Sequence, residues 1–215
     1  AGVRSLLLVG RDARRLKQVE DEARRQAYRA IEIQSFAVDL LDSSKLESWL
    51  VSLEDLPEYP RHWIFSAGGN VSGHFAQGPY ESFAWPEIES QLRLNFEMPL
   101  RVTHAVLPEL LRPAEGESDE LQGSLIYLSS LAAHYPRPGY AAYSGAKSGL
   151  SHFAESLFEE VRERGVRVAV VSPGMVDTPL LPDNPKLDRD RYIRPETVAD
   201  TVRWLLAADP RACPF

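Results

Sequence analysis

Two stretches, SLIYLSS at residues 124–130 and YSGAK at residues 143–147, carry most of the structural information in this chain. The first is a short apolar run that ends in hydroxyl side chains, which is the pattern of a buried strand. The second sets the phenol of Tyr143 and the ammonium of Lys147 one turn apart on the same face of a helix. A strand, a loop and a helix in this order can bring Ser130, Tyr143 and Lys147 together.

A nearby cation favours the phenolate form of tyrosine, so we expect Lys147 to lower the pKa of Tyr143 from its ordinary value of about 10. Such a phenol donates and accepts protons near neutral pH. The Tyr-x-x-x-Lys spacing alone also fits an ordinary helix with an exposed lysine, which is the simpler interpretation of the pair. The preceding strand and the hydroxyl of Ser130 favour the chemical interpretation.

Strands and helices alternate along the rest of the chain. Short apolar runs predict strands at residues 4–10, 31–38, 61–65, 125–129 and 166–171. Periodicity and end signals predict helices at residues 12–28, with Asp12 as the N-cap, and at residues 43–53, 87–111, 140–164 and 195–208. Because the strands are apolar on both faces, we expect a Rossmann-like, doubly wound parallel sheet in a three-layer α/β/α fold.

The bulk composition excludes several classes of protein. At 215 residues the chain has the size of a single domain, and we expect one domain over residues 1–215. The net charge of −7 gives no basic footprint for nucleic acid, and no apolar run is long enough for a membrane span. Cys213 is the only cysteine, which excludes an intrachain disulfide and favours a cytoplasmic location. The five histidines lack metal-ligand spacing, so we expect no metal site.

Short motifs follow each predicted strand, at the edge where such sheets bind ligands. In chain order they are VGRD at residues 9–12, Asp39-Leu40, Ser66-Ala67-Gly68, Ser130, and SPGMVDTP at residues 172–179. With Asn95, Tyr143 and Lys147 in the helices, this set closely resembles the short-chain dehydrogenase/reductase family. The resemblance runs the length of the chain and implies an NAD(P)-dependent oxidoreductase that interconverts a carbonyl and an alcohol by hydride transfer.

The resemblance also implies roles for four residues. Tyr143 is the general acid/base, and Lys147 lowers its pKa and bonds the nicotinamide ribose. Ser130 orients and polarises the substrate carbonyl. Asn95 props open the long helix and completes a proton relay through water.

Further residues match the family's cofactor contacts. Pro173, Gly174, Val176 and Thr178 match the loop that holds the nicotinamide amide, although Thr178 also fits a turn with a helix cap. Asp39 and Leu40 match the adenine contact, and a helix cap or a solvated loop is the alternative for Asp39. Ser66, Ala67 and Gly68 stand where the family usually has Asn-Ala-Gly, so the serine is a departure that puts side-chain contacts there in doubt.

Arg11 bears on the choice of cofactor. It follows the predicted strand where NAD-preferring members tend to carry an acid, and a guanidinium can pair with a 2′-phosphate. We therefore favour NADP, with NAD as the other choice. The alternative is a surface arginine paired with Asp12.

Part of the family pattern has no counterpart here. The first strand, its glycine-rich turn and the following helix are missing, and so is the last strand. We expect either a fragment of a longer protein or a short chain that has lost dinucleotide binding. A missing central strand would leave backbone groups unpaired on both neighbours, so we expect the chain alone to be unstable and to bind cofactor poorly.

The substrate is less well specified. Residues 131–138 and 180–194 would line the mouth of the site, where Tyr135, Pro136, Leu180 and Leu181 favour an apolar carbonyl compound and His74 and His134 are further candidate contacts. The family resemblance implies a homodimer or homotetramer.

Two other functions stay open: a serine acyl-transfer enzyme built on Ser144-x-x-Lys147, which lacks its companion motifs, and a non-catalytic binding or regulatory protein on the same fold. A phosphate-loop nucleotidase is rejected, because His74 stands where the lysine motif should begin.

Overall fold

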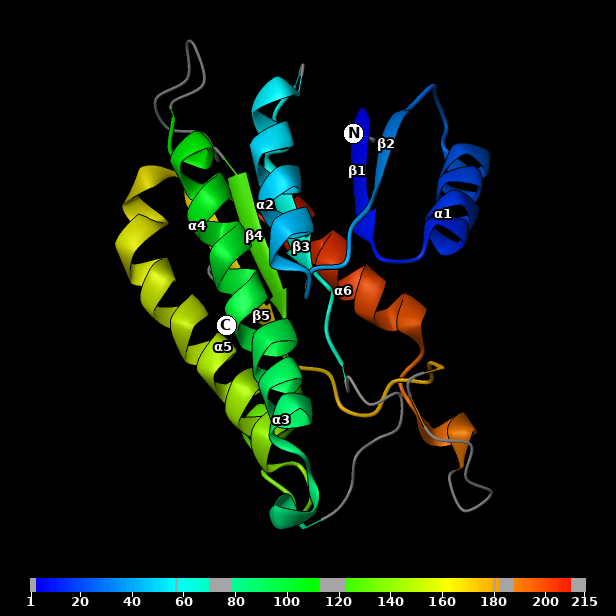
Figure 1. Ribbon diagram of the computed structural model, residues 1–215. Coiled ribbons are helices and arrows are strands. Elements are labelled where there is room, and N and C mark those ends of the chain that lie inside the picture. Colours follow the sequence, from blue (N-terminus) through cyan, green and yellow to red (C-terminus); the bar gives the residue numbers. More distant parts are fainter. Residues whose placement is uncertain are drawn as a thin grey trace. The chain divides into compact units, whose positions relative to one another are not determined.

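The computed structural model describes residues 3–56, 58–69, 79–112, 123–179, 181 and 188–209. It divides the chain into two compact units, Ala1–Pro60 and Arg61–Phe215 (Figure 1). The strands found in these described ranges all pair in parallel, as the sequence predicts, with β1-β2 as one sheet and β3-β4-β5 as another. The expectation of a single domain stays a prediction.

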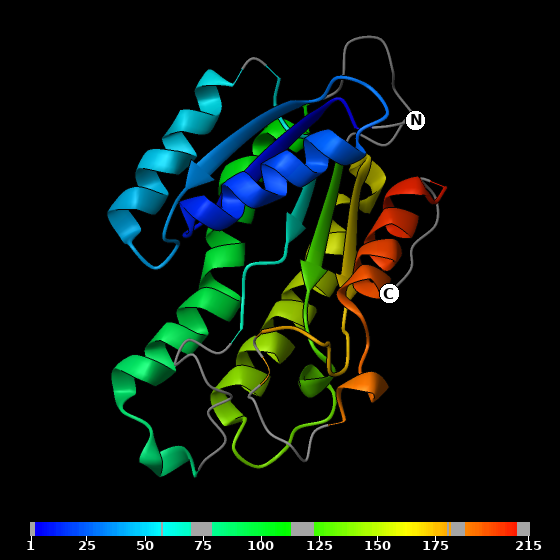
Figure 2. The ribbon, with the colours of Figure 1, turned by 90° about the vertical axis from the view of Figure 1, so that its right-hand side faces the viewer.

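The first unit is a β-α-β-α arrangement. Strand β1 (Ser5–Gly10) pairs along its whole length with β2 (Glu32–Ala37), and α2 (Ser43–Ser52) follows. Helix α1 (Ala13–Gln26) connects the two strands and packs against them (Figure 2). The carboxylate of Asp12 accepts hydrogen bonds from the N–H groups of Arg14 (2.9 Å) and Arg15 (3.1 Å), which confirms the predicted N-cap.

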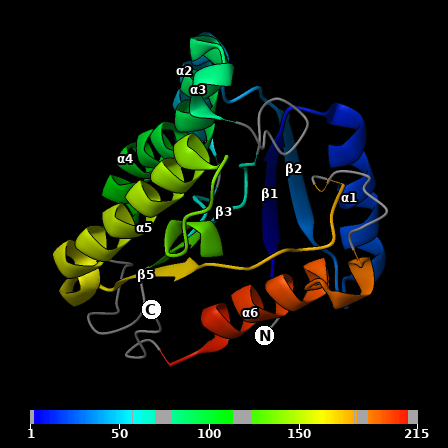
Figure 3. The same ribbon diagram turned by 90° about the horizontal axis from the view of Figure 1, so that it is seen from below.

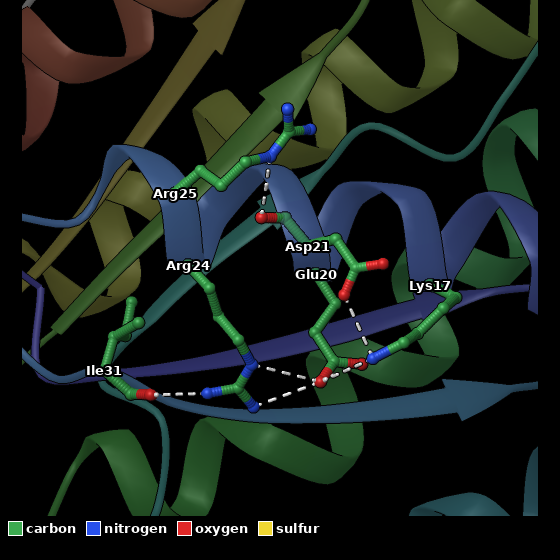
Figure 4. Close-up of polar contacts among 6 residues, drawn as sticks. All are labelled: Lys17, Glu20, Asp21, Arg24, Arg25 and Ile31. Atoms are coloured by element: carbon green, nitrogen blue, oxygen red, sulfur yellow. Dashed lines mark hydrogen bonds and ion pairs between the residues drawn. The ribbon is translucent and has the colours of Figure 1, made fainter.

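Helix α1 is exposed to solvent and carries several ion pairs. None of its residues is buried. Lys17 pairs with Glu20 (3.6 Å) and Asp21 (3.1 Å), and Arg24 pairs with Glu20 (3.1 Å) (Figure 4). Arg24 also donates to the carbonyl of Ile31 at 3.1 Å, just before β2 begins. Helix α1 thus has a solvated face that carries opposite charges at i, i+3 and i, i+4.

The second unit has a better buried sheet. Its strands are β3 (His62–Phe65), β4 (Gly123–Leu128) and β5 (Val166–Val171), in the order β3-β4-β5. Helices α4 (Met98–Leu110) and α5 (Ala141–Val161) lie on one face and α6 (Pro195–Ala207) on the other (Figure 3). Beneath α6, a cluster of buried apolar residues consists of Ile126, Ala169, Val202 and Leu205. No helix in the described residues is long and apolar enough to cross a membrane.

The single helix predicted at residues 87–111 is interrupted. Helix α3 (Trp85–Leu92) and helix α4 are joined by a π-helical turn at Arg93–Glu97, with Asn95 at its centre. Pro99 lies in the first turn of α4, and Pro108 lies inside α4 without ending it. Single π turns inside helices often mark functional positions, and this one sets Asn95 into the interior, fully buried.

Candidate active site

Three consecutive residues at the end of β4 bond to one face of α5. The carbonyl of Leu128 accepts a hydrogen bond from Lys147 Nζ at 2.7 Å. Ser129 Oγ donates to the carbonyl of Lys147 at 3.0 Å and lies 2.8 Å from Ser151 Oγ. The hydroxyl of Ser130 is hydrogen-bonded to Tyr143. Because Tyr143, Lys147 and Ser151 are spaced at i, i+4 and i+8, they share the helix face that meets the strand end.

Lys147 is deeply buried for a charged residue, with 5% of its surface exposed. Burial disfavours the ammonium and lowers the pKa of Lys147 to about 8. The carbonyl of Leu128 compensates part of that cost by accepting one N–H. The amine therefore titrates closer to neutral pH than an exposed lysine.

The structure reverses one expectation about Tyr143. Burial raises the pKa of its phenol; the hydrogen bond with Ser130 opposes that shift, and Tyr140 adds to it. Lys147 Nζ lies 6.0 Å from the centre of the Tyr143 ring and bonds to Leu128 instead. The prediction that Lys147 lowers the pKa of Tyr143 is therefore wrong, because desolvation of the phenol raises its pKa and the Lys147 amine lies too far from it to reverse the shift.

Asn95 holds the loop that follows β3. Its Oδ1 accepts the N–H of Gly69 and its Nδ2 donates to the carbonyl of Gly69, both at 2.8 Å. Nδ2 also lies 3.0 Å from the carbonyl and from Oε1 of Gln91. Gly69 has φ 129°, a conformation that L side chains rarely adopt. The buried amide of Asn95 thus fixes a backbone segment that only glycine forms readily.

Gly68 lies between two of the predicted functional groups. A Cβ added there would lie 3.0 Å from Asn95 Oδ1 and 3.1 Å from Lys147 Nζ. The structure thus brings Gly68, Asn95, Lys147, Tyr143 and Ser130 together within the second unit. Ser66 and Ala67, next to Gly68, are exposed, and the N–H of Ser66 bonds to the carbonyl of Ile64 at 3.1 Å.

The loop after β5 is tied to two other segments. The carbonyl of Pro173 accepts the N–H of Leu131 at 2.9 Å, beside Ser130, and Val176 forms a parallel bridge with Ile193. A Cβ at Gly174 would meet only ordinary contacts, the nearest at 3.8 Å, so the protein alone does not require glycine there.

Thr178 does not cap a helix in the described residues. Its carbonyl accepts the N–H of Leu181 at 3.1 Å, in a turn.

In the first unit, the predicted cofactor contacts lie at the ends of β1 and β2. Arg11 is exposed. Asp12 pairs with Arg15 at 3.6 Å, so the proposed Arg11–Asp12 pair is not the one that forms. Asp39 accepts the N–H of Leu41 at 3.0 Å in a local turn, and the adjacent Leu40 is half-buried. The helix cap considered for Asp39 belongs instead to Asp42, the N-cap of α2.

The remaining candidates are placed as follows. His134 is exposed, with its Nε2 3.5 Å from Ser172 Oγ. Ser144 is buried and its hydroxyl has no hydrogen-bond partner, whereas the amine of Lys147 bonds to Leu128, so the pair does not form an activated serine. His74, Leu180 and Cys213 lie outside the described residues. No metal-binding group of His, Cys, Asp and Glu occurs where the structure describes the chain.

Several residues that support the site were not predicted from the sequence: Gly69, Gln91, Leu128, Ser129 and Ser151. Each contributes a backbone group or an ordinary polar side chain, which no motif distinguishes. The sequence gives a weak indication for Gln91 alone: it lies four residues before Asn95 on the same predicted helix, a spacing at which two side chains can contact each other.

Comparison with known proteins gives a consistent result. The sequence matches the short chain dehydrogenase family over residues 1–187. Sulfoacetaldehyde reductase 2 of Chromohalobacter salexigens is 28% identical over 81% of this chain, which spans 64% of that protein's length. Serine 3-dehydrogenase of Agrobacterium fabrum is 28% identical over 94% of this chain and 77% of its own.

Solved structures share the fold. A metagenomic short-chain oxidoreductase in complex with NADP has a TM-score of 0.77 and 26% identity, and covers all of this chain and 85% of its own. An alcohol dehydrogenase from the archaeon Thermococcus sibiricus, complexed with 5-hydroxy-NADP, has a TM-score of 0.78 at 17% identity, covering all of this chain and 95% of its own. From its motifs, its Rossmann-like fold and the extent of the family match, this chain belongs to the short chain dehydrogenase family.

Proposed function

We propose that this protein is an NADP-dependent oxidoreductase that interconverts a carbonyl compound and an alcohol by hydride transfer. The observation that carries this proposal is the junction of β4 and α5, where Leu128, Ser129 and Ser130 bond to Lys147, Ser151 and Tyr143. One short junction therefore gathers a proton donor, a polarising hydroxyl and a buried amine. These functional groups are the ones that proton transfer to a carbonyl oxygen requires.

The residues around Gly68 fit a nicotinamide cofactor. The absent side chain of Gly68 leaves open the space beside Lys147 Nζ and Asn95 Oδ1, which a Cβ would occupy. In the proposed complex Lys147 would bond the ribose, and the backbone of Val176 with the hydroxyl of Thr178 would hold the carboxamide. The cofactor supplies or takes up the hydride, and the protein positions it.

Tyr143 and Ser130 act on the substrate oxygen. In the reduction, hydride adds to the carbonyl carbon while the phenol of Tyr143 gives its proton to the oxygen. The hydroxyl of Ser130 donates a hydrogen bond to the same oxygen and polarises it. Burial raises the pKa of Tyr143, so the phenol is protonated near neutral pH and can act as the proton donor.

Arg11 supports NADP over NAD. Its exposed guanidinium follows β1 directly, and arginine recognises phosphate through several N–H donors. Related proteins have been solved with NADP bound. We expect Arg11 to pair with the 2′-phosphate of the cofactor.

The substrate we propose is an apolar carbonyl compound. Large apolar side chains are exposed on the segments after β4 and β5 and before α6: Leu131 (40%), Tyr135 (65%), Met175 (40%) and Ile193 (36%). Two of them, Leu131 and Ile193, face Gly174. Exposed apolar groups beside a predicted catalytic serine favour an apolar ligand.

The test is turnover of NADPH by the natural protein with a panel of apolar and polar carbonyl compounds. Tyr143→Phe should lower kcat about 10²- to 10⁴-fold, the usual contribution of a general acid. Tyr28→Phe, at an exposed tyrosine that is not among the predicted site residues, is the matched control and should change kcat little. Arg11→Ala should raise KM for NADPH but not for NADH. Equal turnover by wild type and Tyr143→Phe would reject Tyr143 as the general acid, whereas no turnover by either would favour a non-catalytic binding protein.

A further inference from the structure

Gln91 lies in the last turn of α3, immediately before the π turn, with only 8% of its surface exposed. Its Oε1 accepts a hydrogen bond from Asn95 Nδ2 at 3.0 Å. The same nitrogen lies 3.0 Å from the Gln91 carbonyl, the acceptor that the backbone N–H of Asn95 would use in a regular α-helix. Gln91 thus contacts one side of the Asn95 amide, while Gly69 contacts the other.

The hydrogen-bond count shows what the Gln91 carboxamide contributes. Asn95 Nδ2 has two N–H groups, and three oxygens surround it: the carbonyls of Gly69 and Gln91, and Gln91 Oε1. A flipped Asn95 amide would turn its own oxygen toward all three and its NH₂ toward the N–H of Gly69. Gln91 Oε1 therefore adds to the cost of the wrong orientation, in a buried place where an unmet polar contact is expensive.

The orientation of Asn95 matters because of what it holds. Its amide bonds both backbone groups of Gly69, and its Oδ1 lies on the same side of Gly68 as Lys147 Nζ. We propose that Gln91 is a positioning residue: it fixes the Asn95 amide, which in turn holds the Gly68–Gly69 backbone beside the Lys147 amine. The effect on catalysis rests on the proposed function, whereas the effect on the loop does not.

Hydrogen exchange of single amides in the natural protein tests the inference directly. Gln91→Met keeps the size of the side chain and removes the oxygen acceptor. The Gly69 amide, which donates to Asn95 Oδ1, should then exchange about tenfold faster, the factor that corresponds to one net hydrogen bond. The Ser124 amide, which bonds to the carbonyl of Arg61 in the core, should be unchanged. Gln91→Glu restores an acceptor and should restore protection of Gly69.

Ile88→Val is the matched control, because Ile88 is buried one turn earlier on the same helix (6% exposed). A purely structural role for Gln91 would make both variants alter Gly69 and Ser124 alike. Selective loss of protection at Gly69 in Gln91→Met supports the inference, and unchanged exchange at Gly69 overturns it. If Gln91→Met does not fold, Gln91→Ala gives the same comparison.

The kinetic measurement separates this inference from the proposed function. We expect Gln91→Met to lower kcat for NADPH-dependent reduction by about tenfold, with less change in KM for the carbonyl compound. Selective exposure of Gly69 in a protein that shows no NADPH turnover would support the role of Gln91 and reject the reductase proposal. Normal kcat together with unchanged exchange at Gly69 would reject the role of Gln91 and leave the reductase proposal standing.

Discussion

The first unit, Ala1–Pro60, and the second, Arg61–Phe215, use the same elements but hold their polar residues differently. Asp12 and Asp39 bond to backbone groups two or three residues away. Asn95 and Lys147 bond to groups 26 and 19 residues away, inside the protein. The comparison teaches that long-range contacts fix Asn95 and Lys147 in the interior, whereas Asp12 and Asp39, which here bond to groups close in the chain, are less buried.

The largest expected effect concerns the unfolding free energy, which should fall by different amounts when one leucine in each sheet is replaced by alanine. Leu125 in β4 is fully buried, so Leu125→Ala should cost about 2–5 kcal/mol. Leu7 in β1 is only partly buried, and Leu7→Ala should cost less than about 2 kcal/mol. Urea denaturation of both variants measures the difference. Equal losses would mean that the two sheets are equally well packed.

The buried amine of Lys147 gives a pH-dependent test of intermediate size. Its pKa is about 8 in the folded protein and 10.5 ordinarily, so between these values the unfolded chain binds more protons. The unfolding free energy should therefore rise with pH above 8, by about 2–3 kcal/mol by pH 10, and this contribution should be flat below pH 8. In Lys147→Met the rise should be absent. A difference between the two proteins that stays constant from pH 7 to pH 10 would contradict a buried, depressed lysine.

The smallest expected effect is at the local cap of the first unit. Asp12→Ala removes the acceptor for the N–H groups of Arg14 and Arg15 and should cost about 1 kcal/mol of unfolding free energy. Asp12→Asn keeps an acceptor oxygen and should cost only a few tenths. Thermal unfolding of the three proteins measures this. If the asparagine variant loses as much as the alanine variant, the charge rather than the cap matters.

The sequence predicted the structural features that depend on contacts between residues close together in the chain. The strands β1 to β5 follow from their apolar runs, and the cap at Asp12 follows from its own side chain. The face shared by Tyr143 and Lys147 follows from helical spacing, and the family match is confirmed. These features need contacts between neighbours in sequence, or a pattern that recurs across a family.

Tertiary contacts decided the rest. The direction of the Tyr143 pKa shift depends on burial, and burial is set by segments distant in sequence. The supports at Gly69 and Ser129 bond to partners 26 and 18 residues away. The π turn could not be foreseen, because RLNFE at Arg93–Glu97 reads as ordinary helix and its widening accompanies the bonds of Asn95 to Gln91 and Gly69.

The π turn also sets the phase of the helix around it. One extra residue in a turn rotates everything after it by about 100°, because an α-helix advances that much per residue. Buried residues lie on both sides of the π turn, at Ile88 in α3 and at Val102 and Val106 in α4. Deleting one residue between Arg93 and Glu97 would straighten the helix, but it would turn either Asn95 or the apolar face of α4 toward water.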